Sequence, residues 1–185
     1  MIEMMVAVTI FALVMMIGVG ALLSLAEANR RAQAINSVIG NLSAAIEGIS
    51  RSIRVGSHYH CRTSSTPGTP AELATVNDCS EGGGRLLAFE SSDGNSEDVD
   101  DQIVYRINGT QLERSLDSGA TWVALTAPEV QIESFEIFVI GSNDAGSGDT
   151  TQPRVVIRIE GSAPVPGGST SFSVQAGVTQ RLVDI

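Results

Sequence analysis

The sequence predicts an α+β fold in which one long N-terminal helix packs on an antiparallel β-sheet domain. Two observations lead to this fold class. Apolar residues over the first 54 positions recur at helical spacing, and after Gly56 they alternate with polar residues, as in half-buried strands. A chain of 185 residues has room for one domain beyond such a helix. We therefore divide it into residues 1–26, 27–54 and 55–185.

Residues 1–26 form the apolar half of the predicted helix. No charge occurs from Met4 to Ala26, and a helix that crosses a bilayer needs about 20 such residues. We expect this half to be a membrane anchor. Its representative anchoring residues are Met4, Val8, Phe11, Leu13, Ile17 and Leu22.

Glu3 is the acidic residue at the edge of this apolar run. A carboxylate deep in a bilayer costs roughly 2.5–3.5 kcal/mol on insertion scales. One interpretation places Glu3 at the headgroup level, where the positive end of the helix dipole favours it. The other gives it a cationic partner inside an assembly of such helices, where it would set the register of the subunit.

A cleavable signal peptide is an alternative interpretation, because Ala26, Glu27 and Ala28 resemble a cleavage site. Signal peptides begin with basic residues and have an apolar region of about 7–15 residues, whereas this chain starts acidic and its apolar run is longer. Arg30 and Arg31 are the only basic residues near the segment, and they would keep the following domain in the cytoplasm. A basic leader before Met1 would remove that conflict.

Residues 27–54 form the amphipathic half of the helix, which we expect to pack on the chain's own sheet. Apolar residues recur there at alternating spacings of four and three, while polar residues occupy the other face. The predicted packing residues are Ile35, Ile39, Leu42, Ile46, Ile49 and Ile53.

Residues 55–185 are predicted to form the β domain. Asn108-Gly109 suits the two central positions of a type I′ turn and predicts a hairpin between its flanking segments. A second turn is expected at residues 117–119. The predicted strands are 85–90, 102–107, 110–116, 121–125, 130–132, 135–140, 154–160 and 171–176.

The charge of this domain excludes several functions. The chain has a net charge of −10 and no lysine. Residues 55–185 contain 18 acidic residues and 7 arginines, a net of −11. Nucleic-acid binding needs a basic face, so we expect no nucleic-acid partner. No nucleophile elbow or phosphate-binding loop occurs, since the glycines at 82–84 lack the following lysine. We expect no enzymatic activity.

Cys61 and Cys79 are the only cysteines, and they enclose a loop rich in small residues. Two cysteines that close one loop predict a disulfide in an oxidising compartment. The alternative is a metal site that adds His58 and His60, although zinc sites usually show closer paired spacing.

A polar loop between two predicted strands, residues 91–101, is a candidate calcium site through oxygen ligands. It lacks the glycine and the final glutamate of an EF-hand, so it is not one, and a solvated acidic loop is the alternative. No other cofactor is expected. The candidate ligands are Asp93, Asn95, Asp98 and Asp100.

The segment from Met1 to Leu13 resembles the mature N-terminus of type IV pilins and of the pseudopilins of type II secretion systems. Ile2 and Glu3 would match the isoleucine and glutamate that precede the family's apolar stretch. Residues 121–126, 135–138 and 172–181 resemble minor pseudopilins of the J type. The family's glutamate follows four residues of mature chain, and here it follows two.

The resemblance implies a pilin-like fold and a structural role. A single-pass subunit would wait in the bacterial inner membrane with its domain outside, in contact with an assembly platform. It would then join other pilin or pseudopilin subunits in a filament, where Glu3 pairs with a neighbour's N-terminal ammonium. A membrane-anchored binding module that never polymerises is the second hypothesis, and a secreted protein cleaved after Ala28 is the third.

Overall fold

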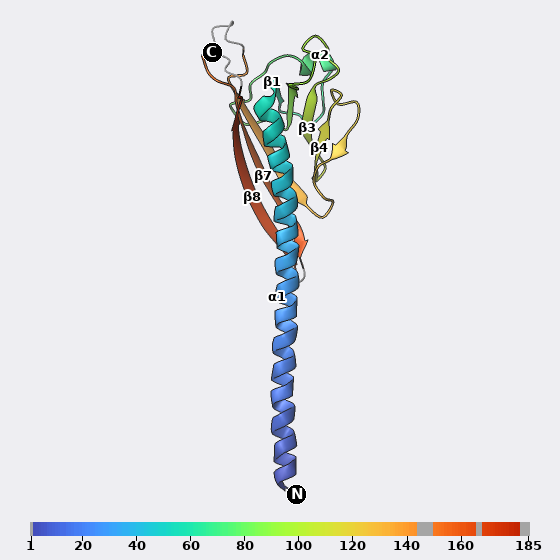
Figure 1. The fold of residues 1–185 in the computed structure, drawn as a ribbon, viewed down its shortest axis with the longest axis vertical. Coiled ribbons are helices and arrows are strands. Elements are labelled where there is room, and N and C mark those ends of the chain that lie inside the picture. Colours follow the sequence, from blue (N-terminus) through green and yellow to red (C-terminus); the bar gives the residue numbers. More distant parts are fainter. Residues whose placement is uncertain (1, 144–149, 166–167, 182–185) are drawn as a thin grey trace.

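A computed structural model of the chain describes residues 2–143, 150–165 and 168–181. One helix forms a long stalk, and the β domain lies along only its C-terminal half (Figure 1). The elements in chain order are α1 (Ile2–Val55), β1 (Ser57–Arg62), α2 (Pro70–Leu73), β2 (Leu86–Glu90), β3 (Ile103–Asn108), β4 (Gln111–Ser115), β5 (Val123–Ala124), β6 (Gln131–Ile140), β7 (Arg154–Val165) and β8 (Gly168–Thr179).

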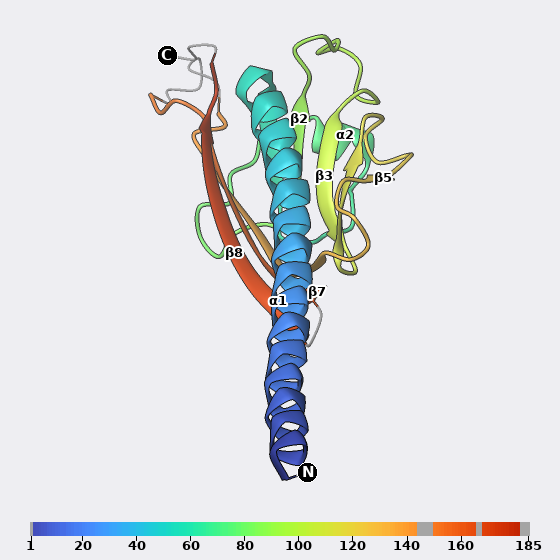
Figure 2. The ribbon, with the colours of Figure 1, turned by 60° about the horizontal axis from the view of Figure 1, so that its bottom comes forward.

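The strands form two antiparallel sheets, so the predicted α+β fold is confirmed. One sheet has the order β1-β2-β3-β4-β5, and the other has the order β6-β7-β8. The C-terminal half of α1 lies against β7 and β8, with the five-stranded sheet on its other side (Figure 2). The helix therefore stands between two sheets and supplies the core with one apolar face.

The buried face of α1 consists of Val38, Leu42, Ile49 and Ile53, with Ile46 partly buried against the same core. The prediction for Ile39 is wrong, because that side chain is 53% exposed while Val38 is 8% exposed. Successive residues point about 100° apart around a helix. Val38 lies four residues before Leu42 and Ile39 lies three residues before it, so the two side chains point to different sides of the helix. The buried stripe continues through Val38. Ile35 is half-buried at the edge of the domain.

A buried tyrosine closes the end of α1. The Tyr59 hydroxyl oxygen lies 2.7 Å from Ile53 O and 2.8 Å from Gly56 O, and its single proton is donated to one of these two carbonyls at a time. The last carbonyls of a helix have no partner within it. Here Ile53 O accepts from the Gly56 N–H (3.1 Å), and the buried hydroxyl adds a second donor beside this helix end. Burial also raises the pKa of Tyr59 far above its usual value, which keeps the hydroxyl a donor. Its ring lies 5.9 Å from that of Phe89, between the centroids.

Backbone hydrogen bonds join the two sheets beside the cysteines. The Gly84 N–H donates to Ile137 O (2.6 Å), and the Ile137 N–H donates back to Gly84 O (2.8 Å). The Cys79 N–H donates to Val139 O (3.1 Å). The edge strand β6 is thus partly covered by the segment that carries the disulfide, and the two sheets share one core.

The sequence did not predict β1 or α2. His58 has a positive φ of 53°, and the β1–β2 register shifts between Ser57 and His60. This irregularity disrupts the alternation by which strands are recognised. The short helix α2 has a capping box, in which Thr69 and Glu72 bond each other's backbone N–H groups. The two strands predicted at 130–132 and 135–140 form one, β6, with a register shift between Ile132 and Ser134.

The β3–β4 hairpin forms, but its turn differs from the prediction. Asn108 pairs with Gln111, so Gly109 and Thr110 are the central residues. Gly109 has a φ of 60°, and neither Asn108 nor Thr110 has a positive φ. A positive φ at the first central residue alone is the pattern of a type II′ turn. The glycine still provides the left-handed position, one place earlier in the turn.

Asp117 organises the turn between β4 and β5. Its carboxylate accepts from Ser115 Oγ (2.6 Å), from the Thr121 N–H (2.8 Å) and from Thr121 Oγ1 (2.5 Å). These hydrogen bonds lower the pKa of Asp117 from 3.8 to about 2, and the bond from Ser115 has the largest effect. Ser118 and Gly119 adopt positive φ inside this turn.

We predict that Ile49→Ala and Ile39→Ala have very different effects on stability. Both change the same residue on the same helix, but Ile49 is 2% exposed. Ile49→Ala should lower the free energy of unfolding by about 2–5 kcal/mol, and Ile39→Ala by less than about 1 kcal/mol. Urea unfolding of the full chain in detergent, followed by the fluorescence of Trp122, measures both. Equal losses would contradict the observed phase of the buried stripe.

We predict that Asp117→Asn removes a pH-dependent part of the stability. A carboxyl whose pKa is lowered by folding stabilises the fold above its unfolded pKa, and this contribution is lost as the pH falls from about 3.8 to about 2. Asp117→Asn should therefore lower the melting temperature at pH 6 and make little difference near pH 2. Asp93→Asn, an exposed change of the same kind, is the control. An equal difference in melting temperature between wild type and Asp117→Asn at both pH values would contradict the role of Asp117.

Candidate functional site

The N-terminal half of α1 is the largest feature that the fold leaves uncovered. Every residue from Ile2 to Gln33 is exposed, and the predicted anchoring residues are 59–73% exposed. By length and composition, α1 is able to cross a membrane. Apolar side chains surround this half on all sides, because positions 4–26 carry no charge. Such a helix belongs in lipid or against other helices.

Glu3 lies in the first turn of α1. Its carboxylate makes no hydrogen bond or ion pair within the described parts of the chain. It stands near the N–H groups of the first turn, where the helix dipole favours a negative charge. The nearby Thr9 hydroxyl is satisfied internally, because it donates to Met5 O (2.8 Å). Within the described part of this half, Glu3 is thus the charged group, and its carboxylate is open to a partner from outside.

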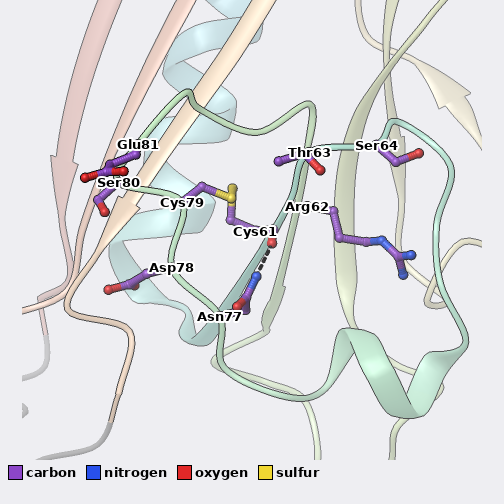
Figure 3. Close-up of a pocket in the computed structure, with 9 residues that line it drawn as sticks. All are labelled: Cys61, Arg62, Thr63, Ser64, Asn77, Asp78, Cys79, Ser80 and Glu81. Atoms are coloured by element: carbon purple, nitrogen blue, oxygen red, sulfur yellow. Dashed lines mark hydrogen bonds between the residues drawn. A yellow bond between two sulfur atoms is a disulfide. The ribbon is translucent and has the colours of Figure 1, made fainter.

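Cys61 and Cys79 are joined in a disulfide, with their Cα atoms 5.7 Å apart. A cavity of about 450 Å³ lies beside the bond (Figure 3). Asn77 closes one side by donating from Nδ2 to Cys61 O (2.6 Å). Asp78 accepts from the N–H groups of Gly141 and Ser142, both at 3.0 Å. The other lining residues are Arg62, Thr63, Ser64, Ser80 and Glu81.

The structure does not bring the two histidines and the cysteines into a metal site. Both sulfurs are used in the disulfide, so neither is a thiolate ligand. His60 is buried and donates from Nδ1 to Thr75 O (2.7 Å), and burial lowers the pKa of its imidazole. His58 is exposed, and its Nδ1 lies 3.1 Å from Ser57 Oγ. Within the described ranges, no three His, Cys, Asp or Glu side chains form a metal-binding group.

The four predicted calcium ligands do not converge on one point. Asp93, Asn95, Asp98 and Asp100 are all exposed. Two of them serve the loop's own backbone: Asn95 Oδ1 accepts from the Glu97 N–H (3.2 Å), and Asp98 Oδ1 accepts from the Asp100 N–H (3.0 Å). They behave as turn-forming residues of a solvated loop.

The buried polar residues of this region lie at the base of the loop. Glu90 and Gln102 are 5% and 3% exposed, and Gln102 Nε2 donates to Glu90 Oε2. Burial raises the pKa of the Glu90 carboxyl, while the hydrogen bond from Gln102 acts in the opposite direction. Sequence reasoning missed this pair, because a glutamate at the end of a strand and before a polar loop is typical of a solvated position.

Comparisons with protein-family models, with curated proteins and with solved structures gave no match to this chain. The functional evidence is therefore its own layout. A long apolar N-terminal helix followed by antiparallel sheets is a pilin-like arrangement.

We predict that the disulfide is a structural crosslink. Replacing both cysteines by alanine should lower the free energy of unfolding by about 3 kcal/mol, because the loop between them regains its freedom in the unfolded chain. Urea unfolding of the full chain in detergent, without reductant, measures the loss. Dithiothreitol should destabilise the wild type and leave the double variant unchanged. Equal stability of the two proteins would show that the bond does not contribute.

Proposed function

We propose that the chain is a structural subunit, a minor pilin or pseudopilin, of a type IV pilus or type II secretion-type filament. The observation that carries this proposal is the continuity of α1. One uninterrupted helix of 54 residues has an uncovered apolar half and a half whose buried face packs on β7 and β8. A subunit that moves from a membrane into a helical filament core needs both halves on one rigid element.

The physical chemistry of the exposed half supports a role in two environments. Lipid tails and the apolar side chains of neighbouring helices are equally apolar, so neither strongly excludes the other. A helix that is apolar on every side is therefore stable in a bilayer and in a helix bundle. Moving between them exchanges one apolar contact for another, without exposing this surface to water.

Glu3 would provide the specificity that an apolar surface lacks. In the proposed filament, its carboxylate pairs with the N-terminal ammonium of a neighbouring subunit. A buried charge without a partner is costly, and a paired and hydrogen-bonded one is much less so. The pairing would admit the subunit only at one axial position. Glu3 is suited to this because its carboxylate has no partner among the described residues.

The β domain fits an extracytoplasmic location. Disulfides persist in oxidising compartments, and the chain has one that joins β1 to the segment hydrogen-bonded to β6. The strongly acidic domain would be repelled by anionic headgroups, which favours a position away from the membrane surface. We therefore place the anchor in the bacterial inner membrane, the domain outside the cytoplasm, and the assembly platform and other subunits among its partners.

We propose a structural rather than a catalytic role. The cavity beside the disulfide is lined by hydroxyl, amide and carboxylate groups and one arginine, without a histidine. Of its two carboxylates, Asp78 is already held by two backbone N–H groups, and Glu81 is exposed. Nucleophilic catalysis needs a nucleophile next to a general base, and the described residues at this cavity do not form such a pair.

We predict that Glu3→Gln blocks entry of the chain into filaments. Removing one partner of a buried ion pair costs about 3–5 kcal/mol, so incorporation should fall by roughly tenfold or more. Filaments sheared from cells that carry the assembly machinery are isolated, and the chain in them is measured by immunoblot. Glu27→Gln, the same change further along the exposed part of α1, is the matched control and should assemble normally.

Three outcomes would argue against this function. Unchanged assembly of Glu3→Gln would remove the role of Glu3. Release of the wild-type chain from membranes by sodium carbonate would contradict the anchor. A wild-type chain that stays in the membrane and never enters filaments would favour the anchored binding module.

A further inference from the structure

Three side-chain oxygens are buried without a hydrogen-bond donor at one end of the five-stranded sheet. They are Glu90 Oε1, Asp101 Oδ1 and Gln102 Oε1. Glu90 ends β2, and Asp101 and Gln102 directly precede β3. The strands pair antiparallel with Phe89 opposite Ile103, so the three residues meet where the 91–100 loop leaves the sheet.

The second oxygen of each carboxylate is already partnered. Glu90 Oε2 accepts from Gln102 Nε2, and Asp101 Oδ2 accepts from the Asn95 N–H (2.8 Å). The two carboxylates are also close, because a Cβ built on Gly94 would collide with Glu90 Oε1 and lie 3.1 Å from Asp101 Oδ2. A glycine at this position lets the loop pass directly over both carboxylates.

No arginine of the described chain neutralises this pair. The ion pairs join Arg51, Arg62, Arg106 and Arg158 to other carboxylates. A buried acceptor without a donor costs free energy, and a buried charge without a counter-charge costs more. One proton shared between two of these oxygens would satisfy both, but it would leave the third oxygen unpaired and one negative charge in place. A divalent cation between the two carboxylates would cancel their charge, and it would also offer a partner to the Gln102 oxygen at the same end of the sheet.

We propose that Glu90, Asp101 and Gln102 bind a calcium ion at the base of the 91–100 loop. The donor set is entirely oxygen, which suits hard cations and not zinc or copper. Calcium accepts mixed carboxylate and amide oxygens with flexible geometry, and water or backbone carbonyls complete its shell. Magnesium demands near-ideal octahedral geometry at shorter distances. The proposal is independent of filament assembly.

The site differs from the one expected from the loop sequence. Asp93, Asn95, Asp98 and Asp100 are exposed and stay outside the proposed coordination. Their role is to shape the loop, through the Asn95 and Asp98 turns. The ion would fix the base of this loop by joining the end of β2 to the start of β3.

Calorimetric titration of the full chain in detergent with calcium chloride, after removal of metal by EDTA, tests the proposal. We expect one saturable site and a higher melting temperature with calcium, measured by Trp122 fluorescence. Glu90→Gln and Asp101→Asn should each weaken binding by about tenfold or more, because each removes a charged ligand. Asp93→Asn, with the same charge change in the same loop, should bind within about twofold of wild type.

Each other result overturns the proposal or part of it. No heat and no thermal shift in the wild type would show that calcium does not bind. Calcium affinity that survives in both Glu90→Gln and Asp101→Asn, or that falls in Asp93→Asn, would place the site elsewhere. An equal thermal shift with magnesium chloride would overturn the assignment to calcium. If Glu90→Gln does not fold, the calcium affinity of Asp101→Asn alone tests the site.

Discussion

The packing of one apolar face of α1 on β7 and β8 is the interaction on which the rest of the molecule depends. Val38, Leu42, Ile49 and Ile53 provide the apolar surface on which β7 and β8 lie. Without that surface, the three-stranded sheet would expose its inner face to water. The same helix continues for more than thirty residues without any cover. The domain therefore holds the stalk in a fixed direction, and the stalk provides the domain with its core.

The junction between helix and sheets is reinforced from several directions. Tyr59 packs at the helix end, where its hydroxyl bonds the carbonyls of Ile53 and Gly56 in turn. The Arg181 N–H donates to Arg54 O (2.8 Å), which ties the end of the described chain to the same place. The disulfide fixes β1 to the segment 79–84, and the hydrogen bonds of Cys79 and Gly84 join that segment to β6. These contacts limit the relative motion of the sheets at the point where the stalk enters.

The sequence predicted the large elements because their signals are periodic and long. The helix, its apolar half and most strands were recognisable from spacing alone. The exact buried stripe of α1, the strand β1 and the β3–β4 turn depend on tertiary contacts, which the spacing of residues in the sequence does not reveal. Val38 replaces Ile39 because the sheet selects one of two adjacent apolar residues. β1 was not predicted because the positive φ of His58 interrupts the strand pattern. The hairpin turn differs by one residue because the pairing of Asn108 with Gln111 makes Gly109 the first central residue of the turn. The burial of Glu90 depends on Gly94 and on residues beyond the loop.

The direction of α1 also determines how the molecule bears a mechanical load. At 1.5 Å per residue, its 54 residues extend about 80 Å. A pull on the N-terminal end acts along the helix axis and parallel to the face that contacts β7 and β8. The load is shear, and the buried side chains from Val38 to Ile53 resist it together instead of separating one after another. The disulfide lies to the side of this axis, so traction on the stalk reaches the domain through its apolar core.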